Sequence, residues 1–201
     1  THADFYKKNY VYGVNAYSKG AVFLSQLGYI IGDSALMKGM KRYYYNWRFK
    51  HPTPQDFKRE MEKVSGLELD WYFEQFVNTT NRIDYAIKSV EKLDASTSIT
   101  LSRLEDIPMP IDMLVKFKDG SFAWYTIPLR IMRGSKSNDV FSSSITILPD
   151  WPWVYPDYTF TIDVKLSKIE EIIIDPSGRL ADVNQLDNKY PFSKRKRIQF
   201  K

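Results

Sequence analysis

The chain has 201 residues, of which 43% are hydrophobic and 15% aromatic, enough to bury a core in one large domain or two small ones. It contains no cysteine, which excludes disulfides, thiolate zinc sites and a cysteine nucleophile. No apolar run approaches the roughly 20 residues that cross a bilayer, so no transmembrane segment is expected, and a signal peptide is expected to be absent or removed.

The net charge of +5 is concentrated at the C-terminus. Six basic residues and no acidic ones lie from residue 189 onward: Lys189, Lys194, Arg195, Lys196, Arg197 and Lys201. Without them the chain has 23 basic and 24 acidic residues. A solvated basic tail over residues 184–201 is therefore favoured over a nucleic-acid or membrane-surface binder, and no nucleic-acid partner is expected.

The first half of the chain has the period of helices. Over residues 13–31 an apolar stripe recurs every three or four positions, at Val14, Tyr17, Ala21, Leu24, Leu27 and Ile31. Asn15 is the expected N-cap of this helix and Gly32 its stop. A second helix follows from Asp33, and its aromatic cluster (Tyr43, Tyr44, Tyr45, Trp47, Phe49) predicts a helix wedged between neighbours.

Two further helices follow in the same half. Thr53, Pro54 and Asp56 form a cap with proline at the first helical position, and this helix is expected to end at Ser65-Gly66. The fourth helix begins near Asp70 and ends in the polar residues 79–81.

After Asn81 the period changes to that of short β-branched and aromatic strands, with Asp119-Gly120 as a hairpin turn. We therefore predict an α+β protein in two units: helices over 1–82 and an antiparallel, Ig-like β-sandwich over 83–183.

Few residues suit catalysis by themselves. The two histidines, His2 and His51, have no ligand partners at helical spacing, and no phosphate-binding glycine loop or G-x-S-x-G elbow is present. Three close carboxylate pairs (Glu60 and Glu62, Glu68 and Asp70, Glu170 and Glu171) are expected to point apart into solvent. Neither a metal site nor a cofactor-binding site is therefore predicted in this chain.

Several motifs occur in an order that resembles the later part of the aminopeptidase N and leukotriene hydrolase family, the gluzincin zinc aminopeptidases. They are Y-x-K-G-A at 17–21, Phe23-Leu24, Gln26-Leu27, Ile31-Gly32, PTPQDF at 52–57 and SGLELDWYFEQF at 65–76. The β-rich remainder is similar to the small sandwich that follows the catalytic domain in many members. The ADVN at 181–184 resembles bacterial members in particular.

The resemblance implies a role for Tyr17, whose hydroxyl would stabilise the oxyanion of the scissile peptide in the parent enzyme. It implies zinc in the full-length parent, a peptide substrate, and an upstream metal-binding part of the same polypeptide as partner. The H-E-x-x-H and G-x-M-E-N motifs of the family are not in this sequence, so the chain is expected to be an inactive C-terminal fragment. A periplasmic or cell-envelope location is favoured over a cytoplasmic one.

Two alternatives remain open. The chain could be a non-catalytic helical and β-sandwich module for binding or scaffolding, as in relatives that have lost the metal. Tyr17 could also be a core residue, with Tyr12 as the nearest tyrosine that a shifted alignment would select.

Overall fold

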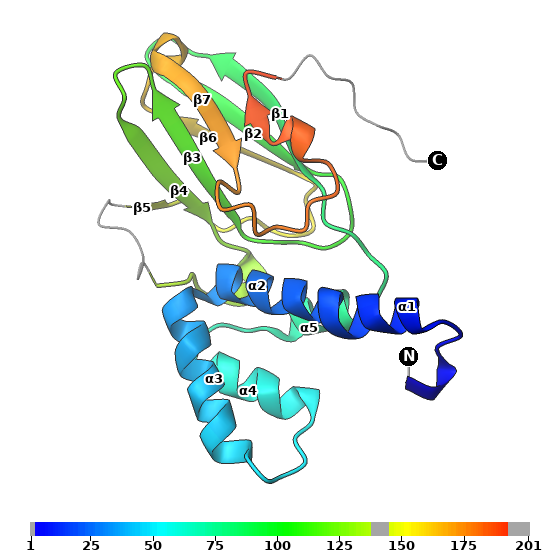
Figure 1. Ribbon diagram of the computed structural model, residues 1–201. Coiled ribbons are helices and arrows are strands. Elements are labelled where there is room, and N and C mark those ends of the chain that lie inside the picture. Colours follow the sequence, from blue (N-terminus) through cyan, green and yellow to red (C-terminus); the bar gives the residue numbers. More distant parts are fainter. Residues whose placement is uncertain (1–2, 138–144, 193–201) are drawn as a thin grey trace.

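The computed structural model describes residues 3–137 and 145–192. Helices fill one end of the molecule and two sheets fill the other (Figure 1). The α+β class predicted from the change of period is confirmed. The last helix, α5 (Asp70–Asn78), ends where the hydroxyl of Thr79 bonds the carbonyl of Gln75, and the first strand begins at Tyr85.

The first helix is longer than its apolar stripe predicts. A short 3-10 turn (Ala3–Phe5) precedes α1 (Asn9–Gly13), which continues through a π-helical stretch (Val14–Ser18) into α2 (Lys19–Ile31). The expected N-cap at Asn15 is wrong, because this residue lies inside the helix and its side chain contacts the Tyr6 hydroxyl. The expected stop at Gly32 is confirmed by its φ of +90°, which favours glycine.

Helix α3 (Asp33–Trp47) leaves α2 at a bend of 119° and pairs with α4 (Pro54–Ser65). The capping box predicted at Thr53 and Asp56 is present, and Gly66 ends α4 in the left-handed conformation. The expectation that α3 is wedged between neighbours is wrong. Tyr43 packs against Phe57, with ring centroids 5.1 Å apart, but other aromatic side chains of the cluster are exposed: Tyr44, Tyr45 and Phe49.

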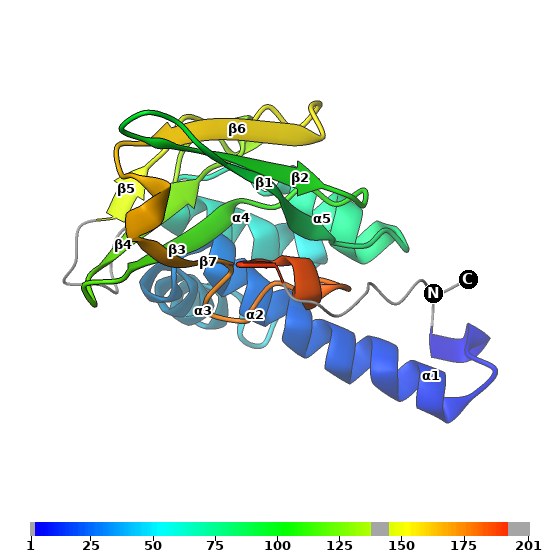
Figure 2. The same cartoon turned by 90° about the horizontal axis from the view of Figure 1, so that it is seen from above.

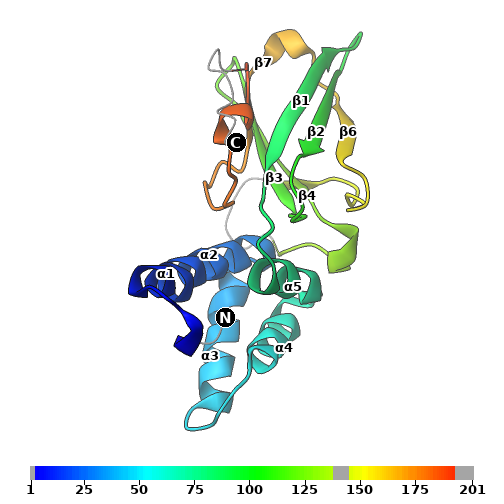
Figure 3. The same ribbon diagram turned by 90° about the vertical axis from the view of Figure 1, so that its right-hand side faces the viewer.

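The strands form two sheets that face each other (Figure 3). The three-stranded sheet has the order β1 (Tyr85–Lys92), β2 (Thr97–Arg103), β6 (Asp157–Ile162). The five-stranded sheet has the order β5 (Ile145–Ile147), β4 (Phe122–Ile127), β3 (Ile111–Phe117), β7 (Ile169–Ile174), β8 (Lys189–Tyr190). The hairpin turn predicted at Asp119-Gly120 joins β3 and β4, and Gly120 has a φ of +84°.

Two details of the sheets differ from the expectation. Strand β5 runs parallel to β4, because a long connection rather than a tight turn separates them, so the sheet is not wholly antiparallel. Strand β8 pairs with β7, and a 3-10 turn (Gln185–Asp187) precedes it. The part of the expected tail up to residue 192 is therefore folded onto the sheet. The basic cluster at 194–197 lies outside the described residues.

One buried core joins the helices to the sheets (Figure 2). The backbone N–H of Asp112 on β3 donates to the Tyr29 hydroxyl at 2.7 Å, and burial raises the pKa of that hydroxyl. The amide oxygen of the fully buried Gln26 accepts from the N–H of Ala181 at 3.0 Å. These contacts fix the C-terminal half of α2 against the sheets.

Among the described residues no single helix is long and apolar enough to cross a membrane. The helices Asn9–Ile31 and Asp33–Trp47, which meet at a bend, reach the length and apolar composition of a membrane span only when they are taken together.

Candidate functional site

Tyr17 lies on the π-helical stretch between α1 and α2, and 71% of its surface is exposed. Its ring meets the edge of Tyr12, with centroids 6.3 Å apart. π-helical turns are rare and occur frequently at functional sites because they redirect side chains within an otherwise regular helix. The structure therefore presents the Tyr17 hydroxyl at the surface and does not bury it in the core of this chain.

An apolar face surrounds Tyr17 on the same helix. Exposed apolar side chains at spacings of three and seven from Tyr17 lie on this face: Tyr10, Val14 and Leu24. Only the end of the predicted stripe, Leu27 and Ile31, is buried. Clustered exposed apolar side chains on a soluble protein commonly mark an interface. Within the described residues this face is open, and we refer to it as the Tyr17 face.

Contacts with α5 hold the middle of α2. The Tyr72 hydroxyl donates to the carbonyl of Phe23 at 2.9 Å, and the two rings stack with centroids 5.0 Å apart. Burial raises the pKa of the Tyr72 hydroxyl, so it stays a neutral donor. The ammonium of Lys19 lies 5.3 Å from the centroid of the Phe76 ring. These contacts fix the helix on which Tyr17 is carried.

Gly20 of the Y-x-K-G motif has open space around it. A side chain at this position would meet no heavy atom within 4 Å among the described residues, so no neighbouring helix approaches it. Ala21, which follows it, is exposed, as is Tyr17, whereas Lys19 is half-buried.

The one histidine that the structure describes, His51, belongs to no cluster of potential metal ligands. His2 lies outside the described residues, and His51 is exposed in the loop between α3 and α4. The carboxylates, in contrast, are closer than the sequence predicted. One oxygen from each of Glu62, Glu68 and Asp70 lies within 4.8 Å of the others. Glu68 and Asp70 do not point apart, because Glu68 precedes α5 and is not helical.

This carboxylate cluster already has partners. Glu62 accepts the N–H of Leu69 at 3.0 Å, and Asp70 is ion-paired with Lys58. Glu68 lies 3.5 Å from the Arg133 guanidinium. Structural and catalytic zinc sites usually include imidazole or thiolate ligands, which this cluster lacks, and two of its three carboxylates are paired with cations of the chain. The described residues of this cluster therefore do not fit the zinc site of the gluzincin aminopeptidases.

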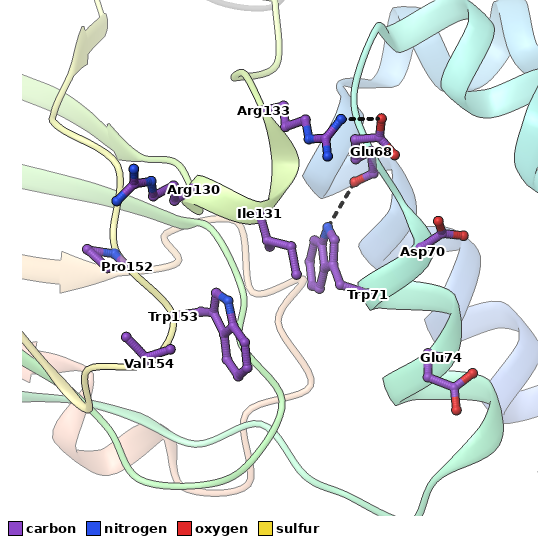
Figure 4. Close-up of a pocket in the computed structure, with 10 residues that line it drawn as sticks. All are labelled: Glu68, Asp70, Trp71, Glu74, Arg130, Ile131, Arg133, Pro152, Trp153 and Val154. Atoms are coloured by element: carbon purple, nitrogen blue, oxygen red, sulfur yellow. Dashed lines mark hydrogen bonds and ion pairs between the residues drawn. The ribbon is translucent and has the colours of Figure 1, made fainter.

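A groove of about 660 Å³ lies between the helices and the sheets (Figure 4). One wall is acidic and comes from α5 and the residues before it, and the other comes from the 3-10 turn Arg130–Met132 and the loop after β5. Labelled residues on the two walls include Glu68, Asp70, Trp71 and Glu74 on one side, and Arg130, Arg133 and Trp153 on the other (Figure 4).

The chemistry of the groove suits binding more than catalysis. The indole N–H of Trp71 donates a hydrogen bond to the backbone carbonyl of Glu68 at 2.9 Å, so it is not free to bind a ligand. No serine, threonine, tyrosine or histidine lines the groove among the described residues. It therefore offers charged and aromatic contacts without a hydroxyl nucleophile or an imidazole base.

A second cavity of about 380 Å³ lies where α2 meets β3. In it, Lys136 forms an ion pair with Asp112, donates to the carbonyl of Tyr29 at 2.9 Å, and sits 4.4 Å from the Tyr29 ring centroid. These contacts link the end of α2 to β3, and the other carboxylate oxygen of Asp112 accepts the hydroxyl of Thr126 on β4 at 2.9 Å. No motif links residues 29, 112 and 136, so this group could not be predicted from the sequence.

The comparison with protein families agrees with the motifs. The model of the Peptidase family M1 domain matches residues 4–76, about a third of the chain, and the match includes Tyr17 and the whole α1–α4 segment. No curated protein matches the chain. Residues 4–76 are therefore a region related to the M1 family of aminopeptidases.

Proposed function

We propose that this chain is the C-terminal part of a zinc-dependent aminopeptidase of the M1 family, which removes N-terminal residues from peptides. In this proposal the helices are the end of the catalytic domain and the two sheets are an Ig-like sandwich that follows it. The observation that carries the proposal is the position of Tyr17. It lies inside the family match, on a π-helical stretch, with its side chain exposed.

Tyr17 would act as an oxyanion donor. A neutral hydroxyl that is fixed in advance strengthens its hydrogen bond as negative charge develops on the carbonyl oxygen of the scissile peptide. The contacts of Phe23 with Tyr72 hold the helix in place, so the hydroxyl would not need to reorganise during the reaction. The hydroxyl would stay protonated and donate a hydrogen bond without transferring its proton.

The zinc of this family would have to be held elsewhere, because the residues present here do not fit it. We propose that an upstream metal-binding part of the same polypeptide covers the Tyr17 face. Two observations support this: Val14, Tyr17 and Leu24 are exposed although they belong to an apolar stripe, and Gly20 has free space around it. Burying such a face on a partner is favourable by about 25 cal/mol per Å² of apolar surface.

The proposal is tested by metal content and peptidase activity. The chain of 201 residues, dialysed against micromolar zinc, should hold no stoichiometric zinc and should not hydrolyse an amino acid p-nitroanilide. The polypeptide that contains this sequence together with its upstream part should do both, and a chelator should abolish the hydrolysis.

Two results would overturn the proposal. One is stoichiometric zinc and hydrolysis by the chain alone. The other is a longer polypeptide with no H-E-x-x-H upstream, which would favour the second candidate, a non-catalytic binding or scaffolding module. The groove of Figure 4, which has aromatic and charged walls but no nucleophile, is the observation that favours this second candidate.

A further inference from the structure

The loop between α3 and α4 contains a phenylalanine, Phe49, that is not covered by any other part of the described chain. Phe49 is 99% exposed and has a φ of +62°, the left-handed region that bulky residues avoid. A backbone in this conformation is held by its surroundings and is often found at functional positions. The loop lies at the end of the helices farthest from the sheets (Figures 1 and 3).

The exposed face of α3 continues the apolar surface from this loop. Met37, Met40 and Tyr44 recur at spacings of three and four on the helix, and all of them are exposed. Tyr45 lies beside Tyr44, with ring centroids 5.6 Å apart. We call these four residues together with Phe49 the α3 patch.

The charge around the α3 patch has one sign. Residues 34–55 contain five basic side chains and no acidic one. Arg42 is paired with Glu60, which leaves Lys38, Lys41, Arg48 and Lys50 for the surface. The Arg48 guanidinium lies 5.6 Å from the Tyr45 ring centroid, and the Lys50 ammonium lies 5.7 Å from that of Trp47.

The nearest acidic residues on either side have other partners. Asp33 is paired with Arg179, and Asp56 accepts the backbone N–H and the hydroxyl of Thr53. The patch is therefore apolar and aromatic at its centre, with positive charge around it that is not neutralised from the flanking segments.

We propose that the α3 patch is a docking surface for a membrane rich in anionic lipid, with Phe49 inserted among the acyl chains and the lysines on the headgroups. Apolar and aromatic side chains bordered by Lys and Arg are the composition that places a helix in the interface of an anionic bilayer. The long stems of Lys38 and Lys41 allow their ammonium groups to reach the headgroups while α3 lies flat.

The shape and chemistry of the patch favour a lipid surface over a nucleic acid. Single-stranded nucleic acids bind in basic grooves where bases stack on aromatic rings. Phe49 is instead almost fully exposed in the loop between α3 and α4, and Met37 and Met40 offer no flat ring for stacking. The proposal rests on residues other than Tyr17 and is independent of the peptidase activity.

Vesicle sedimentation tests the proposal. The chain of 201 residues is mixed with vesicles of phosphatidylcholine alone, or with phosphatidylglycerol added at about a third of the lipid. Binding is expected to the anionic vesicles only, and it should weaken when sodium chloride is raised from 0.1 to 0.5 M, because the Debye length shortens from about 10 Å to roughly half of that.

Three variants locate the bound surface. Phe49→Asn should weaken partitioning by about tenfold, since an apolar ring no longer inserts, while asparagine accepts the positive φ and preserves the loop. Lys38→Gln with Lys41→Gln should weaken it by about fivefold for each lysine. Phe49→Trp should bind as well as the parent chain, because its ring suits the interface.

Matched controls separate the patch from other surfaces. Phe122→Asn changes an exposed phenylalanine on β4, and Lys165→Gln changes an exposed lysine before β7, so neither should alter partitioning. The melting temperature of every variant should stay within a few degrees of that of the parent chain.

Four outcomes would overturn the proposal. They are no binding to anionic vesicles, binding that Phe49→Asn and the lysine variant leave unchanged, preference for a single-stranded oligonucleotide that displaces the vesicles, and a dimer at micromolar concentration that Phe49→Asn dissociates. The second would assign binding to another basic segment, such as residues 194–197.

Discussion

Arg179, which follows β7, makes a two-pronged ion pair with Asp33, the first residue of α3: Nη1 to Oδ2 is 3.1 Å and Nη2 to Oδ1 is 2.9 Å. The same guanidinium donates to the carbonyl of Ser25 from Nε and Nη2. Gly28 makes room for it, because a Cβ there would lie 2.4 Å from Nη2. Arg179, in the segment after β7, thus links the end of α2 to the start of α3.

We expect Arg179→Ala to lower the free energy of unfolding by about 1–2 kcal/mol, since it removes bidentate charge-assisted bonds and leaves the Ser25 carbonyl without these donors. Arg179→Lys should recover only part of this, because a single ammonium cannot reproduce the fork. Urea unfolding measures both. Arg133→Ala is the control: its contact with Glu68 is exposed and 3.5 Å long, so it should change little. Equal effects of the two alanine variants would contradict this account.

The packing of α3 on α4 depends on Gly39. A Cβ at this position would lie 2.5 Å from the sulfur of the fully buried Met61. Gly39→Ala should therefore destabilise the chain by about 1–3 kcal/mol, because Met61 must move in a filled core. Gly20→Ala should be neutral or stabilising by up to about 1 kcal/mol in this chain, since its surroundings are open and alanine favours a helix. Thermal unfolding of the pair tests the contrast, which a loss of stability in Gly20→Ala would contradict.

Local signals in the sequence predicted the ends of several elements. The capping box at Thr53, the left-handed glycines at 32 and 66, and the turn at Gly120 depend on residues within one turn of each other. Such conformational preferences act before any tertiary contact forms, so they can be read directly from the chain. Asn15 is the exception, because a longer helix overrode its preference for a cap.

Properties that depend on distant neighbours were not predictable. The aromatic run of α3 has no clear polar side, so the sequence did not tell which rings are covered, and Tyr44, Tyr45 and Phe49 proved to be exposed. Glu60 was expected in solvent, but Arg42 lies 18 residues earlier and pairs with it across two helices. The parallel pairing of β5 likewise depends on the course of a long connection.

The candidate site came from motif order and not from periodicity. The helical stripe alone would place Tyr17 in a core, whereas the structure exposes it. The family match to residues 4–76 supports the relation to M1 peptidases that the Y-x-K-G motif indicated. The wall of the groove that contains Arg130 and Trp153 (Figure 4) was not predicted. No sequence motif links these residues to α5, which forms the opposite wall.

Glu60 should make the chain sensitive to acid. Burial raises the pKa of this carboxyl, but the side chains of Asn46 and Arg42 outweigh that effect and hold the pKa below its usual value. A folded pKa below the unfolded value of about 4.3 gives stability that is complete above that pH and is lost as the pH falls through the folded pKa. We therefore expect the melting temperature to decrease when the pH is lowered below about 4.

Glu60→Gln isolates this contribution. It should cost about 1–2 kcal/mol at pH 7, because the charged hydrogen bond to Arg42 is lost, and the difference from the parent chain should shrink towards pH 3. The exposed Glu170→Gln serves as the control and should follow the pH profile of the parent chain. A constant difference between the parent chain and Glu60→Gln from pH 7 to 3 would exclude the role of this carboxylate.

The prediction for Tyr17 concerns the proposed longer polypeptide, in which a metal-binding part would precede this chain. Tyr17→Phe removes one hydroxyl and keeps the ring that meets Tyr12. If that hydroxyl donates to the developing oxyanion, the bond gains strength mainly in the transition state. We therefore expect kcat to fall by roughly 10²–10³-fold, with KM changed much less and the melting temperature unchanged.

Tyr12→Phe is the matched control, since Tyr12 is an exposed tyrosine on the same helix and contacts the Tyr17 ring. Its turnover should stay within about twofold of that of the parent enzyme, because peripheral hydroxyls contribute little to the barrier. Both variants are compared by kcat, KM and melting temperature with an amino acid p-nitroanilide. If Tyr12→Phe loses turnover and Tyr17→Phe does not, the oxyanion donor is Tyr12. If neither loses turnover, the proposed role of Tyr17 is wrong, and the π-helical stretch has no part in catalysis.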